Sequence, residues 1–278
     1  MHELFLTGVV RDDDLEMARA VLQGFCAMNS WQSTHRVLFF RGPPQPKGLP
    51  KSEAIPKLPQ TQALWRDLHQ NLARQSYVLQ LRYEVFRDRD FGGDAMQTDA
   101  KPATLDHTPG TLRWTDIPDP TGNRPVTQRK KVDIPDQRNL IRVVQDNGHV
   151  FKSEAIEESH TYFRDNLEFT ILRYHSLPQD QQSSGAPAPR SSLPPWDTLA
   201  TQDPAGKWLL LVRAHVAEDT SPEKMQKAHD ELTAVRDELL GVFEFRILDR
   251  RVHDTRIAQQ QNNMPAALPQ KIQVGGRQ

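Results

Sequence analysis

The sequence predicts an α+β fold in which a large β-sheet, closed or nearly closed into a barrel, carries a few packed helices. Most segments with a clear pattern are short and alternate between apolar and polar residues, which is typical of strands that bury one face. Helical periodicity is limited to a few segments. The middle of the chain lacks the helices that would alternate with strands in a doubly wound sheet, so a barrel is favoured.

The clearest predicted strand covers residues 76–86. Its apolar face carries Tyr77, Leu79, Leu81, Tyr83 and Val85, and its polar face carries Gln80, Arg82 and Glu84. The same period of two predicts strands over 33–41, 208–216 and 242–248. Weaker patterns predict further strands over 2–10, 110–117, 124–133, 150–163 and 166–175.

Apolar residues spaced by three and four predict helices over 13–29, 61–74 and 222–240. Residues 137–146 fit either a short helix or a strand that is closed by a turn at residues 147–148. A strand, a helix and a strand follow one another at both ends of the chain, over 2–41 and over 207–248. These two βαβ units of similar length bracket a mostly β middle and predict a pseudo-symmetric sheet that closes on itself.

The chain of 278 residues is expected to form one barrel domain over 1–258. Disordered insertions are expected near 42–60, 88–109 and 178–206, and a disordered tail over 259–278. Prolines concentrate in the first and third insertions. Such segments bury too little apolar surface to offset the entropy cost of ordering them.

Composition excludes several classes of protein. The 35 basic residues nearly cancel the 36 acidic ones, whereas a protein that tracks nucleic-acid phosphates needs a basic excess. No apolar run approaches the length of a membrane span, and no secretory signal is expected. The single cysteine cannot form an intrachain disulfide, which favours a reducing compartment. The scattered histidines predict no metal site, and no cofactor motif or catalytic residue is found.

Three charged stretches need an interpretation, and two of them have alternatives. Glu157 and Glu158 are expected to be solvated. The basic run over 129–131 is expected to be an exposed strand edge, or else a nuclear-import patch. The mixed stretch over 249–256 is either a solvated end or a contact strip for another protein. Its candidate contact residues are Arg250, Arg251, Asp254 and Arg256.

The order of several segments carries a family resemblance. The chain opens with the segments 2–6, 21–28 and 35–43, continues with 77–83, 112–114 and 169–174, and closes with 208–212, 225–240 and 243–245. In this succession the chain resembles Mediator complex subunit 18 in its fungal form. No single segment is a signature, so the resemblance lies in their order.

The resemblance implies a non-catalytic subunit of the Mediator head, the coactivator that links regulators to RNA polymerase II in the nucleus. It implies an antiparallel β-barrel of about eight strands with packed helices, related to the triphosphate-tunnel enzymes. It also implies two partners, Mediator subunit 20 as a heterodimer and the C-terminal helix of subunit 8. No cofactor, metal, nucleic acid or membrane is implied.

A metal-dependent triphosphate-tunnel hydrolase is the alternative function. Such an enzyme needs rows of carboxylates on inward strand faces. Here Glu3, Glu84, Glu168 and Glu244 each stand alone at the two-residue spacing of their strands. Glu84 is in register with Arg82, and Glu244 with Arg246, which predicts neutralised pairs. A barrel that binds a small molecule is a third interpretation and would need an open apolar interior.

Overall fold

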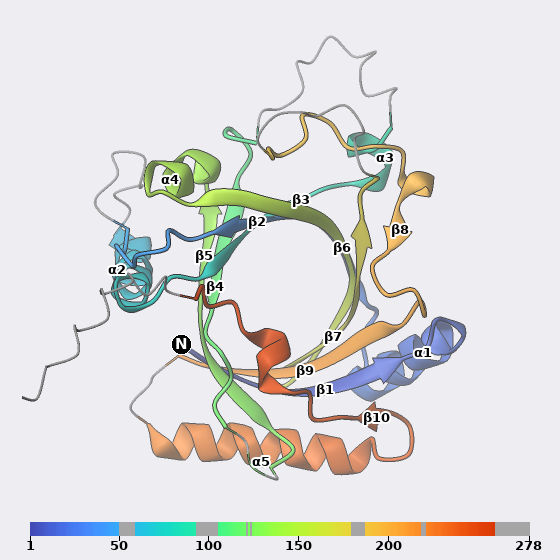
Figure 1. The fold of residues 1–278 in the computed structure, drawn as a ribbon. Coiled ribbons are helices and arrows are strands. Elements are labelled where there is room, and N and C mark those ends of the chain that lie inside the picture. The colour runs from blue at the N-terminus through green and yellow to red at the C-terminus, as the bar shows by residue number, and fades with distance from the viewer. Residues whose placement is uncertain are drawn as a thin grey trace, which may run out of the picture.

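Eight strands form a closed antiparallel barrel, seen along its axis in Figure 1. The computed structural model describes residues 1–49, 59–92, 105–120, 122, 124–178, 187–217 and 221–258. Around the barrel the order is β1 (His2–Val10), β5 (Thr127–Gln137), β4 (Gly110–Thr115), β3 (Val78–Glu84), β2 (Trp31–Arg41), β6 (Val150–Arg164), β7 (Leu167–Ser176) and β9 (Trp208–Val216). β9 pairs with β1 along its whole length and closes the ring.

Helices cover the outside of this ring (Figure 1). α1 (Leu15–Cys26) and α5 (Pro222–Glu238) pack on one side, and α2 (Pro59–Arg74) and α4 (Leu140–Asp146) on the other. α3 (Arg87–Asp90) is a single turn that follows β3. No helix in the described residues is both long and apolar enough to cross a membrane.

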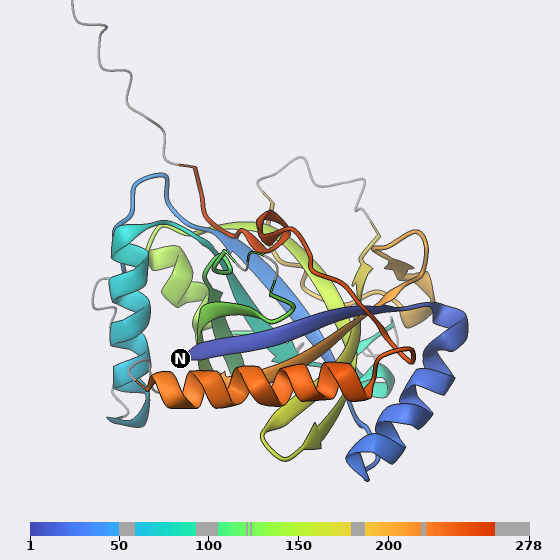
Figure 2. The ribbon, with the colours of Figure 1, turned by 90° about the horizontal axis from the view of Figure 1, so that it is seen from below.

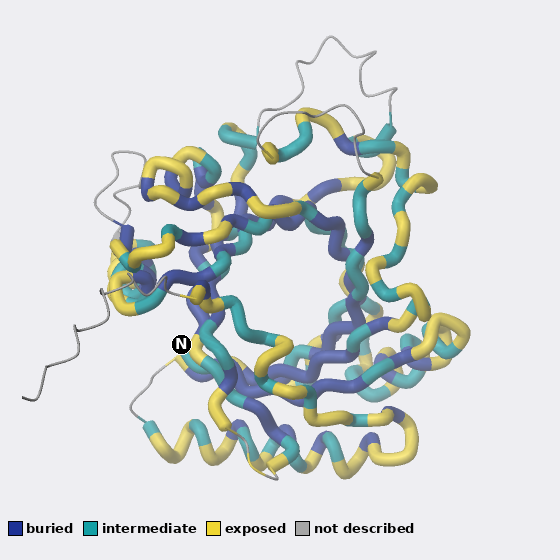
Figure 3. The backbone as a smooth tube through the Cα atoms, in the orientation of Figure 1, coloured by how far each residue is buried: buried dark blue, intermediate teal, exposed yellow. Residues whose placement is uncertain are grey.

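The hydrophobic cores lie between the barrel wall and the helices. Leu22 of α1 and Leu232 of α5 are fully buried in one cluster with outward residues of β7 and β9. Leu68 of α2 and Val143 of α4 are fully buried in a second cluster with outward residues of β3 and β5. Burial of each such side chain contributes about 1.5–3 kcal/mol. Figure 3 shows that buried residues follow the strands and not the outer helix surfaces.

The predicted strands and helices are present with small changes at their ends. The ambiguous segment over 137–146 divides between the last residue of β5 and the helix α4. The strand predicted over 242–248 is reduced to β10 (Glu244–Phe245), which lies outside the ring. β5 pairs with β1 only as far as Phe5, so the two residues of β10 pair with β1 beyond that point, at Gly8 and Val9.

The two end units keep the predicted order of strand, helix and strand. β1 and β2 do not pair, because four strand steps separate them in either direction around the ring. α1 therefore runs along the outside and joins opposite walls, as the side view in Figure 2 shows. α5 connects β9 to β10, which both pair with β1, so this second unit does not join opposite walls.

Parts of the expected insertions lie outside the described residues, namely 50–58, 93–104 and 179–186, and so does the expected tail over 259–278. Within the third insertion, residues 187–206 contain a 3-10 turn (Trp196–Thr198) and the short strand β8 (Ala200–Thr201), which pairs with β7. Leu193 from this segment is buried with Val85 and Ile156 on the outer wall.

Candidate functional site

The barrel encloses a tunnel of about 700 Å³ that all eight strands line with their inward side chains. Because successive residues of a strand point to opposite faces, the strands that send apolar residues outward send polar ones inward. The inward set contains five cations, Arg82, Arg113, Arg129, Lys131 and Arg213. Their carboxylate partners are Glu3, Asp133, Glu157 and Glu168.

Glu3 and the basic residues of β5 form the densest part of this network. The fully buried Glu3 carboxylate accepts hydrogen bonds from Arg129 at 2.6 Å and from Lys131 Nζ at 3.1 Å. Lys131 also lies 3.2 Å from Asp133, and the Arg113 guanidinium binds the same carboxylate through two hydrogen bonds of 2.8 Å.

The pKa values of this group follow from burial and pairing. Burial opposes ionisation of Glu3, but Lys131 and Arg129 outweigh it and hold the pKa of Glu3 well below its usual range. Burial likewise opposes ionisation of Asp133, yet Arg113 and Lys131 lower its pKa to about 2. Burial and the nearby Arg113 lower the pKa of Lys131.

Two further pairs complete the lining. Arg82 donates two hydrogen bonds to Glu157, at 2.9 and 2.5 Å, and the hydroxyl of Tyr174 donates a third at 2.7 Å. Arg213 donates to Glu168 at 2.6 Å, and His215 Nε2 lies 3.1 Å from the same carboxylate. Burial opposes ionisation of Glu168, but the hydrogen bond from His215 and the charge of Arg213 lower its pKa to about 2.

These contacts define what the tunnel can do chemically. The three lining carboxylates and the buried Glu3 beside them are each bound to at least one arginine or lysine side chain, so none is left open to a divalent cation. The described residues contain no group of three metal-ligating side chains. The interior is also charged, whereas a barrel that binds an apolar small molecule would need an apolar one.

The structure corrects the predicted pairing of Glu84 with Arg82. Arg82 pairs with Glu157 instead, and Glu84 is exposed at the end of β3. The predicted pair of Glu244 and Arg246 is confirmed at 2.6 Å, but both residues lie on the surface and not in the tunnel. The carboxylate partner of Arg82 comes from a different strand, so spacing within one strand could not identify it.

The expectation that Glu157 and Glu158 are solvated is wrong. Glu157 is only 4% exposed and faces the tunnel. Glu158 points outward and pairs with Arg87 and Arg173, and His175 Nε2 lies 3.0 Å from the same carboxylate.

The basic run over 129–131 is not an exposed strand edge, because β5 pairs with β1 on one side and β4 on the other. Arg129 and Lys131 face the tunnel, which also contradicts an import patch made of all three residues. Asp133 and Glu157 were missed as tunnel residues. The alternation of side chains along a strand could have identified such residues. Arg129, Lys131 and Asp133 alternate with outward residues of the same strand.

The stretch after β10 crosses one end of the tunnel, and we call residues 246–258 the C-terminal strap. The amide of Arg246 donates to Thr7 O on β1 at 2.8 Å. At the far side Val78 N donates to Thr255 O at 2.7 Å, and Ile257 N to Ser76 O at 2.8 Å. Figure 2 shows the strap at the end of the barrel opposite the β6–β7 hairpin.

Between these attachments the strap forms a short 3-10 helix (Arg250–His253). The His253 ring lines the tunnel and stands edge-on to Phe5, with ring centres 5.6 Å apart. The strap holds all four candidate contact residues, Arg250, Arg251, Asp254 and Arg256. Arg251 pairs with Asp249 at 2.8 Å, and Arg256 pairs with Asp254 at 2.7 Å.

Comparison with known proteins places this architecture in a family. The family model described as Med18 protein matches residues 2–256. The Mediator of RNA polymerase II transcription subunit 18 from Aspergillus oryzae is 24% identical over 157 residues. That match covers 56% of this chain and 56% of the relative, so the chain spans little more than half of the curated relative's length.

A solved structure has the same fold. A chain of the Schizosaccharomyces pombe Mediator head module superposes with a TM-score of 0.59 and 17% identity, covering 92% of this chain and 100% of that one. The family match takes in every barrel strand and every helix described above. The chain therefore belongs to the Med18 protein family.

Proposed function

We propose that this chain is a non-catalytic subunit of the Mediator head module, which acts through protein–protein contacts that link regulators to RNA polymerase II. The observation that carries the proposal is the family match over residues 2–256. The fold similarity to a chain of the S. pombe head module supports it.

The tunnel lining supports a non-catalytic role. A metal-dependent hydrolase of this shape would need carboxylates free to bind a cation. Here Glu3, Asp133, Glu157 and Glu168 are held by arginine and lysine side chains, so the alternative is not favoured. The charged pairs act as the internal framework of the barrel.

The proposed partners are Mediator subunit 20, as a heterodimer, and the C-terminal helix of subunit 8, in the nucleus. Residues 1–258 are proposed as the single folded domain that these partners recognise. The strap residues Arg250, Arg251, Asp254 and Arg256 are proposed as contacts, because they gather at one end of the barrel.

Co-expression with subunits 20 and 8, followed by size-exclusion chromatography with light scattering, tests the assembly. A stable complex with one copy of each subunit is expected. A monomer that elutes apart from both subunits would refute the assembly.

A charge-reversal pair tests the strap contacts. Arg250→Glu with Arg251→Glu should weaken the complex, whereas the control Arg11→Glu with Arg142→Glu changes exposed arginines elsewhere and should not. If both double variants form the complex equally well, the strap is not part of the interface. The assembly itself would still be supported.

A further inference from the structure

One stretch of the barrel wall has an open edge. β3 ends at Glu84, opposite His35, whereas β2 begins four residues earlier, at Trp31. Residues 31–33 pair with β6 on one side, and no described strand pairs with them on the other. The last bond along that edge runs from Val85 N to Thr34 O, at 3.0 Å.

The backbone of Gln32 faces this open edge. Thr34 O points toward the β3 side, and backbone groups in a strand alternate in direction at each residue. The N–H and C=O of Gln32, two positions earlier, therefore point the same way. A free strand edge of this kind is a template for an added strand.

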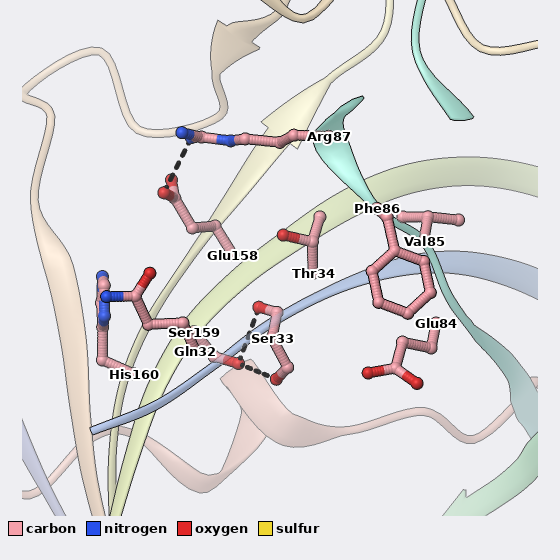
Figure 4. Close-up of a pocket in the computed structure, with 10 residues that line it drawn as sticks. All are labelled: Gln32, Ser33, Thr34, Glu84, Val85, Phe86, Arg87, Glu158, Ser159 and His160. Atoms are coloured by element: carbon pink, nitrogen blue, oxygen red, sulfur yellow. Dashed lines mark hydrogen bonds and ion pairs between the residues drawn. The ribbon is translucent and has the colours of Figure 1, made fainter. Parts of the chain in front are cut away.

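A pocket of about 150 Å³ adjoins the edge and is drawn in Figure 4. Four of the polar side chains in its walls already have partners. The hydroxyls of Ser33 and Ser159 lie 2.9 Å apart, and Arg87 donates to Glu158 at 2.9 Å. The Arg87 guanidinium also lies 3.7 Å from the centre of the Trp196 ring, so it is held away from Glu84.

Glu84 differs from Glu158, the other carboxylate in this pocket. It is exposed and forms no hydrogen bond or ion pair with any other described residue. The Asp90 carboxylate and, less strongly, the charge of Glu84 raise the pKa of Arg89. The Arg89 guanidinium is bound to Asp90 at 2.9 Å and not to Glu84. In Figure 4 the Glu84 carboxylate and the ring of Phe86 lie on the same side of the pocket, and Phe86 is 48% exposed.

We infer that this edge and pocket form a docking site for an extended peptide segment of a partner protein that carries an arginine or lysine. The segment adds to the barrel as a strand beside Gln32 and bonds its backbone N–H and C=O. The basic side chain enters the pocket, lays its aliphatic stem against Val85 and Phe86 and pairs with Glu84. The inference depends only on the local geometry of this edge and pocket, and it goes beyond the proposed function.

A library of random twelve-residue peptides displayed on phage, selected against the full chain, tests the site. The enriched peptides should share one basic residue among residues that favour strands. Glu84→Lys should weaken their binding by about tenfold or more, because a charge-assisted hydrogen bond is replaced by repulsion. Gln32→Pro should weaken it similarly by removing the edge N–H, whereas Gln32→Ala, which keeps that group, should not.

Thermal melts of the three variants should match the original chain, since Glu84 and Gln32 are exposed. Enriched peptides that bind Glu84→Lys and Gln32→Pro as tightly as the original chain would overturn the inference. So would the absence of enrichment over a selection against the Glu84→Lys, Gln32→Pro double variant.

Discussion

Arg82 of β3 and Glu157 of β6 bind each other across the inner face of β2, the strand that separates them. Two parallel hydrogen bonds, from Nη1 to Oε2 at 2.9 Å and from Nη2 to Oε1 at 2.5 Å, join the two side chains. Both side chains are less than a tenth exposed. Burial opposes the charge on Glu157, but Arg82 and Tyr174 hold the pKa of Glu157 far below its usual range.

Removal of one member of this pair should destabilise the fold strongly. Arg82→Met leaves Glu157 buried without its cation, which costs about 3–5 kcal/mol of unfolding free energy. The double variant Arg82→Met, Glu157→Leu removes both charges and should recover most of that loss. Urea unfolding measures both values. Equal stability of the two variants would show that the charges do not depend on each other.

Acid should weaken the fold through the tunnel carboxylates. The folded-state pKa values of Asp133 and Glu168 are lowered to about 2, from ordinary values of 3.8 and 4.5. Between these values the two carboxylates are protonated in the unfolded chain but still ionised in the folded chain. The stabilisation is complete above about pH 5 and is lost as pH falls toward 2, on the order of 2 kcal/mol for Asp133.

Thermal melts between pH 2 and pH 7 measure this loss. Asp133→Asn should flatten the acid limb of the curve, since an amide does not titrate. The surface variant Asp237→Asn is the control, because Asp237 is exposed. An identical acid limb in the original chain and in Asp133→Asn would contradict the assignment.

The outer half of the barrel could be predicted from sequence, and the inner half could not. Outward residues such as Leu81 and Val212 obey an apolar period that is visible along one strand. Glu157 and Lys131 also follow the two-residue alternation of their strands. The sequence of a polar strand face is the same whether that face meets solvent or a closed tunnel. Their burial depends on ring closure between β1 and β9, strands about 200 residues apart in sequence.

The edge pocket escaped prediction for a related reason. Glu84 looked neutralised because Arg82 stands two residues away on the same strand face. The real partner of Arg82 comes from β6, and this leaves the Glu84 carboxylate free. Local spacing gives candidate neighbours, but strand register decides which of them pair.

Mild acid should loosen the strap through His253. Burial and the nearby Arg129 lower the pKa of His253 to about 4, while the unfolded chain protonates near its ordinary 6.5. The folded pKa is depressed, so stability is lost as pH falls from about 6.5 toward 4. His253→Phe keeps an aromatic ring beside Phe5 without the titration. Its melting temperature should fall by about 2–4 °C less than that of the original chain between pH 7 and pH 5.

The strap should matter for stability well beyond its length. Deletion of residues 246–278 removes the hydrogen bonds to Thr7, Val78 and Ser76 and the buried Ile257. The expected loss is about 3–5 kcal/mol of unfolding free energy. Deletion of 259–278 alone keeps the whole strap and serves as the matched control. Urea unfolding distinguishes the two, and equal midpoints would mean that the strap lies on the barrel without supporting it. A loss confined to the longer deletion would instead show that the strap replaces strand pairing at the two places where β1 and β3 run beyond their neighbours in the ring.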